Sequence, residues 1–170
     1  FTGNFTNASG TVEAGSDTAF GVGGTLRFAG GSTVIGVNGP RTFANDMTQS
    51  GGGTMTWTFG GSDPMEFTGD LNITNSAVKP KTFNATNSAS TTFSGAISAH
   101  PNQTIAKSGA GILVFSGDNT YTNQTIVRQG TLRIDGNPTG GATYTVGGGS
   151  ITGDAAIGGT GTIGLASGAN

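Results

Sequence analysis

A phenylalanine followed by a small residue and a glycine recurs along the chain, and this recurrence limits the folds open to it. The triplet occurs at Phe1-Thr2-Gly3, Phe28-Ala29-Gly30, Phe67-Thr68-Gly69, Phe93-Ser94-Gly95 and Phe115-Ser116-Gly117. Most successive triplets start about 22 to 27 residues apart, and such self-similarity is typical of solenoids, in which each repeat forms roughly one coil. One longer gap, between Phe28 and Phe67, is divided by the variant Phe43-Ala44-Asn45.

The composition favours a long and thin core. The 170 residues include 33 glycines and 10 phenylalanines, and only 33% of the residues are hydrophobic. A wide globular core needs more apolar residues, whereas each coil of a solenoid needs only a few inward side chains, which it buries against its neighbours. Charged residues make up 9% of the chain, which separates it from typical charged disordered segments.

The apolar runs are short and alternate as β-strands do. In residues 54–59, Met55, Trp57 and Phe59 share one face and three threonines share the other. Gly, Asn and Ser-Gly between such runs indicate tight turns and exclude a long helix. The sequence therefore predicts an all-β fold, a single parallel β-solenoid, and coils of about 22 to 24 residues would give it about seven turns.

Further short strands are expected on both sides of the middle of the chain. Before residue 40 they centre on Phe5, Val12, Phe20–Val22, Leu26–Phe28 and Val34–Val37. After residue 143 they lie at Tyr144–Val146, Ser150–Thr152, Ala156–Ile157 and Thr162–Leu165. The close spacing of this last group predicts a solenoid that narrows toward its end.

Like residues in stacked coils lie above one another at the spacing of neighbouring strands, about 4.8 Å. We therefore expect several of the recurring phenylalanines to form an internal ladder. In the stretch 107–134, Leu113 and Phe115 share one face, and Leu132 and Ile134 share another, with Arg133 pointing outward. The predicted core ladder comprises Phe28, Phe67, Phe93, Phe115, Leu113, Val127, Leu132 and Ile134.

This central stretch resembles the passenger-associated transport repeat, also called the autotransporter-associated β-strand repeat, of bacterial autotransporters. The matching positions are Lys107, Gly109, Gly111, Leu113, Gly117, Asn119, Thr120, Tyr121, Thr125, Val127, Gly130, Thr131 and Leu132. Phe115 replaces a leucine of the pattern, and Asn123 stands where the family usually has glycine; both are tolerable, because Phe is apolar and Asn also adopts left-handed turns. The resemblance implies a right-handed parallel β-helix that is secreted and displayed outside a bacterial cell, and it implies no catalytic residues.

Some right-handed β-helices cleave acidic polysaccharides, so the acidic residues are candidates for a site. Asp63, Glu66 and Asp70 form the one local cluster, next to a Pro turn. A Ca²⁺ ion needs about six to eight oxygen ligands and a glycosidase needs two carboxylates facing one bond, so acids in a surface turn are weak candidates for either. Five other aspartates are expected to bond to backbone in turns: Asp17, Asp46, Asp118, Asp135 and Asp154.

No other motif predicts catalysis, a cofactor or a metal. His100 is the one histidine and lies in a Pro-flanked loop, which rules out a three-His zinc site. The Gly-rich runs at 147–149 and 158–161 lack the Lys-Ser/Thr ending of a phosphate loop, so they are interpreted as turns. Six asparagines stand in Asn-x-Ser/Thr triplets, which arise by chance in a chain of this composition: Asn4, Asn7, Asn72, Asn84, Asn102 and Asn123.

Charge and hydropathy exclude two classes of partner. The net charge is −2 and the seven basic residues are scattered singly, so no basic patch is available for a nucleic acid. No run of apolar residues is long enough for this segment to insert into a membrane as a helix. The absence of cysteine removes disulfides and thiolate metal sites, and it is compatible with export through a narrow pore in an unfolded state.

The chain is interpreted as a single β-solenoid domain, residues 1–170, and its start at Phe1 indicates an excerpt or a processed fragment of a longer exported protein. Residues 164–170 still follow the repeat pattern, and no polar helical cap is evident at either end. Either the rod continues in the same chain or copies associate through the ends of the solenoid.

We therefore expect a non-catalytic extracellular structural protein, a stalk or fibre subunit displayed on or released from a bacterial surface. It would stack end to end into filaments, serve adhesion, and contact host or matrix glycans or proteins. The alternative is a carbohydrate-binding or polysaccharide-cleaving β-helix module, in which outward Thr and Asn ladders and the loops 74–81 and 98–103 form a groove.

Overall fold

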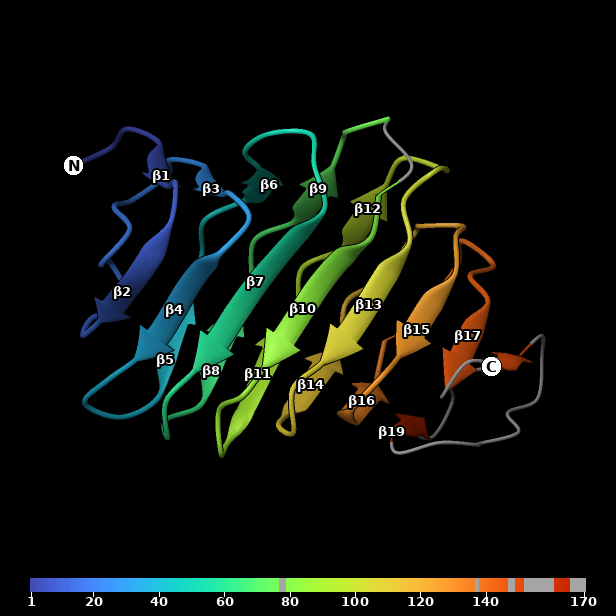
Figure 1. Ribbon diagram of the computed structural model, residues 1–170. Helices are drawn as coiled ribbons and strands as arrows, with labels where there is room; N and C mark the ends of the chain where they lie inside the picture. Colours follow the sequence, from blue (N-terminus) through green and yellow to red (C-terminus); the bar gives the residue numbers. More distant parts are fainter. Residues whose placement is uncertain (77–78, 137, 147–148, 152–160, 166–170) are drawn as a thin grey trace.

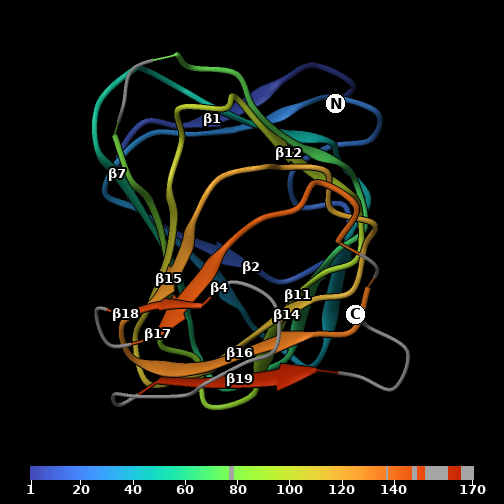
Figure 2. The ribbon, with the colours of Figure 1, turned by 90° about the vertical axis from the view of Figure 1, so that its right-hand side faces the viewer.

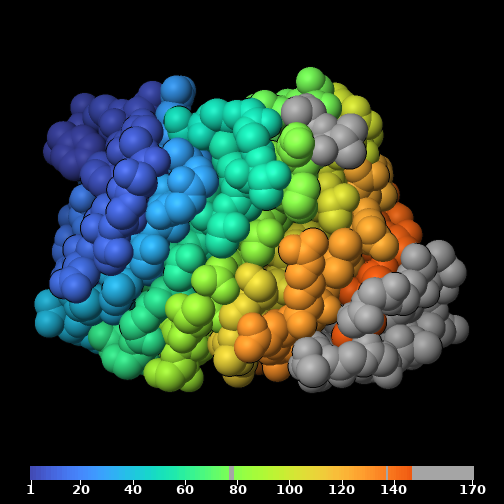
Figure 3. Space-filling model, in the orientation of Figure 1, coloured from blue at the N-terminus to red at the C-terminus, as the bar shows by residue number. Residues whose placement is uncertain are grey.

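The computed structural model is a parallel β-solenoid (Figure 1). It describes residues 1–76, 79–136, 138–146, 149–151 and 161–165, and for the last two ranges the backbone alone. Each full coil contributes one strand to each of three sheets, so the cross-section has three sides and three corners. In the space-filling view the coils appear as stacked oblique bands from the N-terminal to the C-terminal side (Figure 3).

The three sheets are built from short strands. The first sheet has β1 (Phe5–Asn7), β3 (Leu26–Phe28), β6 (Met47–Gln49), β9 (Leu71–Ile73) and β12 (Ile97–Ala99). The second has β2 (Gly10–Ala14), β4 (Ser32–Gly36), β7 (Met55–Gly60), β10 (Lys81–Ala85), β13 (Ile105–Ser108), β15 (Thr125–Val127), β17 (Tyr144–Val146) and β18 (Gly149–Ile151). The third has β5 (Arg41–Phe43), β8 (Met65–Phe67), β11 (Ser90–Phe93), β14 (Ile112–Phe115), β16 (Gly130–Ile134) and β19 (Gly161–Leu165).

The chain winds as a right-handed helix. Seen from the C-terminal side, it runs down the second sheet, across the third and back over the first, counterclockwise, while it advances toward the viewer (Figure 2). This is the usual hand of parallel crossovers. All the pairings between these strands are parallel except that of β17 with β18. The all-β solenoid predicted from the sequence is confirmed, with about six turns instead of about seven.

The core takes side chains from all three sheets and contains a column of phenylalanine rings stacked across coils of the third sheet. Backbone register sets Phe43 opposite Phe67, Phe67 opposite Phe93, and Phe93 opposite Phe115. The ring centroids are 5.2, 5.0 and 6.1 Å apart along this series, which is the range of favourable aromatic pairs. All four rings are buried.

In the triplets that end β8, β11 and β14, the glycine is required by the corner that follows the third sheet. A Cβ on Gly95 would lie 2.1 Å from the carbonyl oxygen of Gly69, and one on Gly117 would lie 2.2 Å from that of Gly95. Successive coils touch at this corner through their backbones, so no side chain fits between them. In the third sheet the triplet therefore encodes an inward ring, an outward residue and a close backbone approach, whereas Gly3 and Gly30 have room for a Cβ.

Two details of the first coils differ from the prediction. Residues 20–22 lie in a turn region instead of a strand. The side chain of Phe20 is buried, and its ring centroid lies 4.8 Å from that of Phe43. The ring column therefore continues here without a strand of the third sheet. Phe28 is buried in β3 of the first sheet, opposite Asn7 and Gln49, and its ring meets the column from the side, with its centroid 6.5 Å from that of Phe20. Phe43, which the sequence marked as a variant triplet, occupies the place in the column.

Coils shorten toward the C-terminal side. The interval from Met55 to its partner Lys81 in the next coil is longer than the interval from Thr125 to its partner Tyr144. The shortening coincides with the end of the first sheet, whose last strand is β12 among the described residues. In the axial view the coils of β15 and β17 enclose a smaller outline than the earlier coils (Figure 2). The strand expected at Ala156–Ile157, and Asp154, lie outside the described residues.

Candidate functional site

The most distinctive side-chain arrangement joins two consecutive coils at the corner between the second and third sheets. Lys107 of β13 points into the solenoid and is fully buried. Its Nζ donates hydrogen bonds to the carbonyl oxygens of Ser108 and Gly109, both at 2.7 Å, and of Gln129 at 3.0 Å. Gln129 belongs to the next coil, so one ammonium group holds two turns together.

Burial lowers the pKa of Lys107 from 10.5 to about 8, because the charged form loses its hydration. An ammonium group has three N–H donors, and the three carbonyl oxygens accept all of them. A buried charge without such partners costs several kcal/mol, on the order of the cost of a broken buried ion pair. The carbonyl oxygens therefore explain how a lysine is accommodated in an otherwise apolar position.

The carbonyl groups face Lys107 because the two corners turn through glycines. Gly109 and Gly130 have φ values of +75° and +70°, a left-handed conformation that side chains disfavour. A Cβ on Gly130 would also lie 2.3 Å from the carbonyl oxygen of Gly109. Glycine is thus needed at both positions for conformation and for space.

Asn119 and Tyr121 shape the third corner of the same coil, where the first sheet has ended. The buried Asn119 accepts a hydrogen bond from the backbone N–H of Ile97 through Oδ1 at 2.9 Å. The ring of Tyr121 is buried, and its hydroxyl accepts a hydrogen bond from Thr125 at 3.1 Å. Burial, followed by the neighbouring Tyr144 hydroxyl, raises the pKa of Tyr121. Tyr121 thus fills the interior where longer coils have a strand.

The remaining inward residues of these coils complete the apolar core. Five of them are buried: Leu113, Phe115, Val127, Leu132 and Ile134. Leu113 pairs with Leu132 and Phe115 with Ile134 in the register between β14 and β16. The ring column therefore passes into an aliphatic column at this point, as the coils become shorter.

These features define a β-solenoid unit that spans more than one coil, from β13 through β16, with a lysine in one coil bonded to the turn of the next. Residues 105–134 match the family model of the passenger-associated-transport-repeat. The resemblance to the autotransporter repeat is thus confirmed for this segment. Searches of curated proteins and of solved structures found no match.

The match agrees with the geometry, because the pattern includes the lysine, both left-handed glycines, the asparagine and the tyrosine. Each of these residues forms a contact within or between the two coils. The repeat and the fold fit a structural passenger that is exported toward the cell surface or the extracellular space. The family indicates a structural rather than a catalytic role.

The acidic cluster does not converge. Asp63 lies in the turn before β8 and accepts the Gly39 N–H at 2.9 Å through Oδ2. Glu66 points outward from β8 and accepts the Ser94 hydroxyl at 2.6 Å. Asp70 lies after β8, at the next corner. Strand β8 separates Asp63 from Asp70. The three acids, which are close in sequence, therefore bond separately to backbone or hydroxyl groups.

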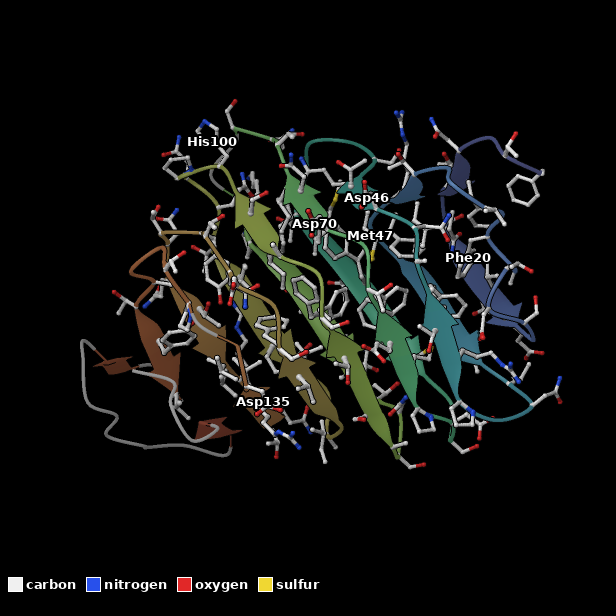
Figure 4. All side chains as sticks on the ribbon, turned by 180° about the vertical axis from the view of Figure 1, so that it is seen from behind. Phe20, Asp46, Met47, Asp70, His100 and Asp135 are labelled. Carbon is white, nitrogen blue, oxygen red and sulfur yellow. The ribbon has the colours of Figure 1, made fainter. Side chains whose placement is uncertain are left out.

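Aspartates instead connect successive coils at the corner before the first sheet. Asp46 Oδ1 accepts the backbone N–H of Asp70 at 3.0 Å, and Asp70 Oδ1 accepts that of Ala96 at 2.9 Å. Figure 4 shows Asp46 and Asp70 next to each other near the start of the first-sheet strands. The sequence predicted bonds within each turn, but Asp46 bonds to the following coil, because parallel coils bring equivalent turns together.

The described residues of the loops 74–81 and 98–103 bond to each other at two points, as neighbouring coils require. Gln103 Nε2 donates to the carbonyl oxygen of Asn75 at 2.6 Å, and Asn102 Nδ2 donates to that of Ser76 at 3.4 Å. His100 lies in this loop, and its Nδ1 accepts the Asn102 N–H at 3.3 Å (Figure 4). The side chain contacts its own loop.

Within the described residues, no group of three or more His, Cys, Asp or Glu side chains is placed to hold a metal ion. Nor does that part of the chain contain a helix long and apolar enough to cross a membrane.

Sequence reasoning located Lys107 in the motif but missed that it is buried. The signal was present in the alternation of β13, because Lys107 shares the face of the buried Ile105. Lys81 in β10 is similar: it is fully buried, and its Nζ donates to the carbonyl oxygen of Gly53 at 2.8 Å. Burial lowers its pKa as well.

Proposed function

We propose that this chain is a non-catalytic structural part of a secreted protein, a β-solenoid stalk or fibre subunit displayed on or released from a bacterial surface. The observation that supports this proposal best is the two-coil unit of residues 105–134, because its matched residues form solenoid contacts. Coils that bond mainly to their neighbours build a stiff rod that holds other parts at a distance.

Cell fractionation and protease treatment of intact cells of the source bacterium test the display. Antibodies against this chain should label the cell surface or the culture medium, and external protease should remove the surface signal. Retention of the protein inside cells that express it would refute the proposal.

We further propose that the rod associates end to end. Strands β1 and β2 lie at the N-terminal edge of their sheets, and each has one strand partner among the described residues. An edge strand presents unpaired backbone groups that bind another strand. A charged side chain on such an edge opposes this association.

Thr11 is exposed in β2 and suits this test, and Thr56, exposed in the interior strand β7, is its matched control. Thr11→Lys should lower the association measured by analytical ultracentrifugation and shorten fibres seen by electron microscopy, whereas Thr56→Lys should change neither. Equal association of the two variants, or a wild-type protein that stays monomeric at high concentration, would contradict the end-to-end model.

We also propose that the rod serves adhesion. The rod would bind host or matrix glycans or proteins through its polar exterior. Glycan arrays and matrix-coated surfaces probe this directly. Cleavage of a glycan that depends on Asp63 or Glu66 would favour a polysaccharide-cleaving module over a structural role.

A further inference from the structure

The turn between β4 and β5 holds an Asn-Gly dipeptide in an unusual conformation (Figure 1). Asn38 has φ +66° and is the one non-glycine residue with positive φ among the described residues, and Gly39 has φ +102°. Asn38 is exposed to solvent. Asparagine is a thermolabile residue, and a following glycine leaves the next backbone nitrogen unhindered because it has no Cβ.

The peptide group that joins Asn38 to Gly39 is polarised at both ends. Its N–H donates to Asp63 Oδ2 at 2.9 Å. Its carbonyl oxygen, that of Asn38, accepts a hydrogen bond from Arg41 Nη2. Asp63 comes from the turn between β7 and β8, in the next coil, so the stacking of coils creates this arrangement.

Other charges around the turn hold Arg41 in place. Arg41 Nε donates to the carbonyl oxygen of Val37 at 2.8 Å, and Arg41 Nη1 lies 3.6 Å from Asp17 Oδ1. Asp17 also accepts the backbone N–H of Thr42 at 3.0 Å. The guanidinium group is thereby directed at the Asn38 carbonyl oxygen.

We propose that Asn38-Gly39 is a self-modification site at which Asp63 and Arg41 promote conversion of the asparagine to aspartate and isoaspartate. Asp63 removes the proton from the Gly39 nitrogen, and Arg41 stabilises the negative charge that develops on the Asn38 carbonyl oxygen. A carboxylate within hydrogen-bond distance is placed as a general base, and a donor to the developing anion is placed as its stabiliser.

The reaction balances with water alone. The Gly39 nitrogen attacks Cγ of Asn38, the C–N bond of the side-chain amide breaks, and ammonia leaves with the proton that Asp63 had taken. A five-membered succinimide remains. Water then opens one of its two carbonyl groups, which gives either aspartate or isoaspartate, in which the main chain runs through the former side chain.

The modification changes the surface of the rod. Either product adds one negative charge beside Arg41 to a chain whose net charge is −2. Isoaspartate also lengthens the backbone of the turn by one carbon. The turn lies on the side of the solenoid where β4, β7 and β10 end (Figure 1), so the new carboxylate forms part of the exterior.

The dipeptide Asp135-Gly136 of the same chain is an internal control for isomerisation at Asn38-Gly39. Its glycine nitrogen donates to the carbonyl oxygen of Phe115 at 3.2 Å, and a Cβ on Gly136 would lie 2.1 Å from that of Gly117. The corner is closely packed, and the proton acceptor is a peptide carbonyl instead of a carboxylate. Isomerisation of this dipeptide should therefore be slow in the folded chain.

The test is incubation of the purified full chain at neutral pH, followed by peptide mapping with mass spectrometry and an isoaspartate assay. The product should accumulate at residue 38 before any other asparagine. Asp63→Asn should lower the rate constant by about 10²-fold, the lower end of the contribution of a positioned base, and Arg41→Gln should lower it as well. Asp46→Asn is the matched control, because Asp46 also accepts a backbone N–H, and it should leave the rate unchanged.

Two results would overturn the proposal. One is an Asp63→Asn variant that keeps the β-sheet circular dichroism spectrum and reacts as fast as the wild type. The other is a folded wild-type chain that reacts no faster than a free peptide of residues 37–41. The second comparison needs no variant, so it decides the question even if Asp63→Asn fails to fold.

Discussion

Replacement of Lys107 by methionine tests whether one ammonium group joins two coils. The substitution keeps an unbranched side chain only one atom shorter and removes its charge and its three donors. Two opposite effects follow. Removal of the buried charge relieves its desolvation, and the carbonyl oxygens of Ser108, Gly109 and Gln129 lose their hydrogen-bond partners.

The cost of the lost hydrogen bonds exceeds the gain from the avoided desolvation. The shift of the Lys107 pKa from 10.5 to about 8 corresponds to about 3 kcal/mol of desolvation that methionine avoids. Each buried acceptor without a partner costs about 1 to 3 kcal/mol, so three cost about 6 kcal/mol. We therefore expect Lys107→Met to lower the free energy of unfolding at neutral pH by about 3 kcal/mol.

The change in the free energy of unfolding with pH is a second, independent test of the buried Lys107. The folded chain releases the Lys107 proton near pH 8, whereas the unfolded chain retains it to about pH 10.5. Unfolding between these values takes up a proton, so the free energy of unfolding rises with pH, by up to about 3 kcal/mol. Lys107→Met should lose this contribution to the rise, while the contribution of Lys81, whose pKa burial also lowers, should remain.

Urea unfolding of both proteins between pH 7 and pH 10.5, followed by circular dichroism, measures both effects, with the exposed Lys79→Met as control. A Lys107→Met protein as stable as the wild type at neutral pH would refute the assignment of the three carbonyl contacts. An unchanged rise with pH would show that another group causes it.

Three further substitutions test the core and the corners. Phe93→Ala removes a ring with four aromatic neighbours and should lower the free energy of unfolding, measured in urea, by about 3 to 5 kcal/mol. Its control is Phe1→Ala, at a residue 70% exposed, which should leave the free energy of unfolding almost unchanged. Gly95→Ala should lower the melting temperature because its Cβ would lie 2.1 Å from a carbonyl oxygen, while Gly53→Ala, with open space around it, should not; equal effects would contradict the close packing. Tyr121→Phe removes the acceptor of the Thr125 hydroxyl and should cost about 1 kcal/mol, and a larger loss would indicate that the ring itself is displaced.

Local patterns in the sequence were sufficient to predict the solenoid. Alternation in residues 54–59 placed Met55, Trp57 and Phe59 on one face, and all three are buried. The Phe-small-Gly triplets at Phe67, Phe93 and Phe115 each predicted a buried ring and a turn from only three neighbouring residues. The match of residues 105–134 confirmed the resemblance for the segment where the motif is most complete.

The spacing of residues in the sequence did not predict which residues of successive coils lie opposite each other. Coil length is not constant, because Lys81 follows its partner Met55 at a longer interval than Tyr144 follows its partner Thr125. The recurring triplet therefore grouped Phe28, which lies in the first sheet, with Phe67, Phe93 and Phe115 of the third sheet. For the same reason the count of about seven coils exceeded the observed number.

The sequence by itself determined the class of fold and the inward face of most strands, because alternation, glycine turns and apolar runs act over a few residues. Only the tertiary structure decided which side chains meet across coils. It placed Lys107 against the turn of Gln129, separated Asp63 from Asp70, and brought Asp63 to the peptide group of Gly39. The physical reason is that parallel backbone pairing sets the register of each coil, so residues about one coil apart become neighbours at hydrogen-bond distance.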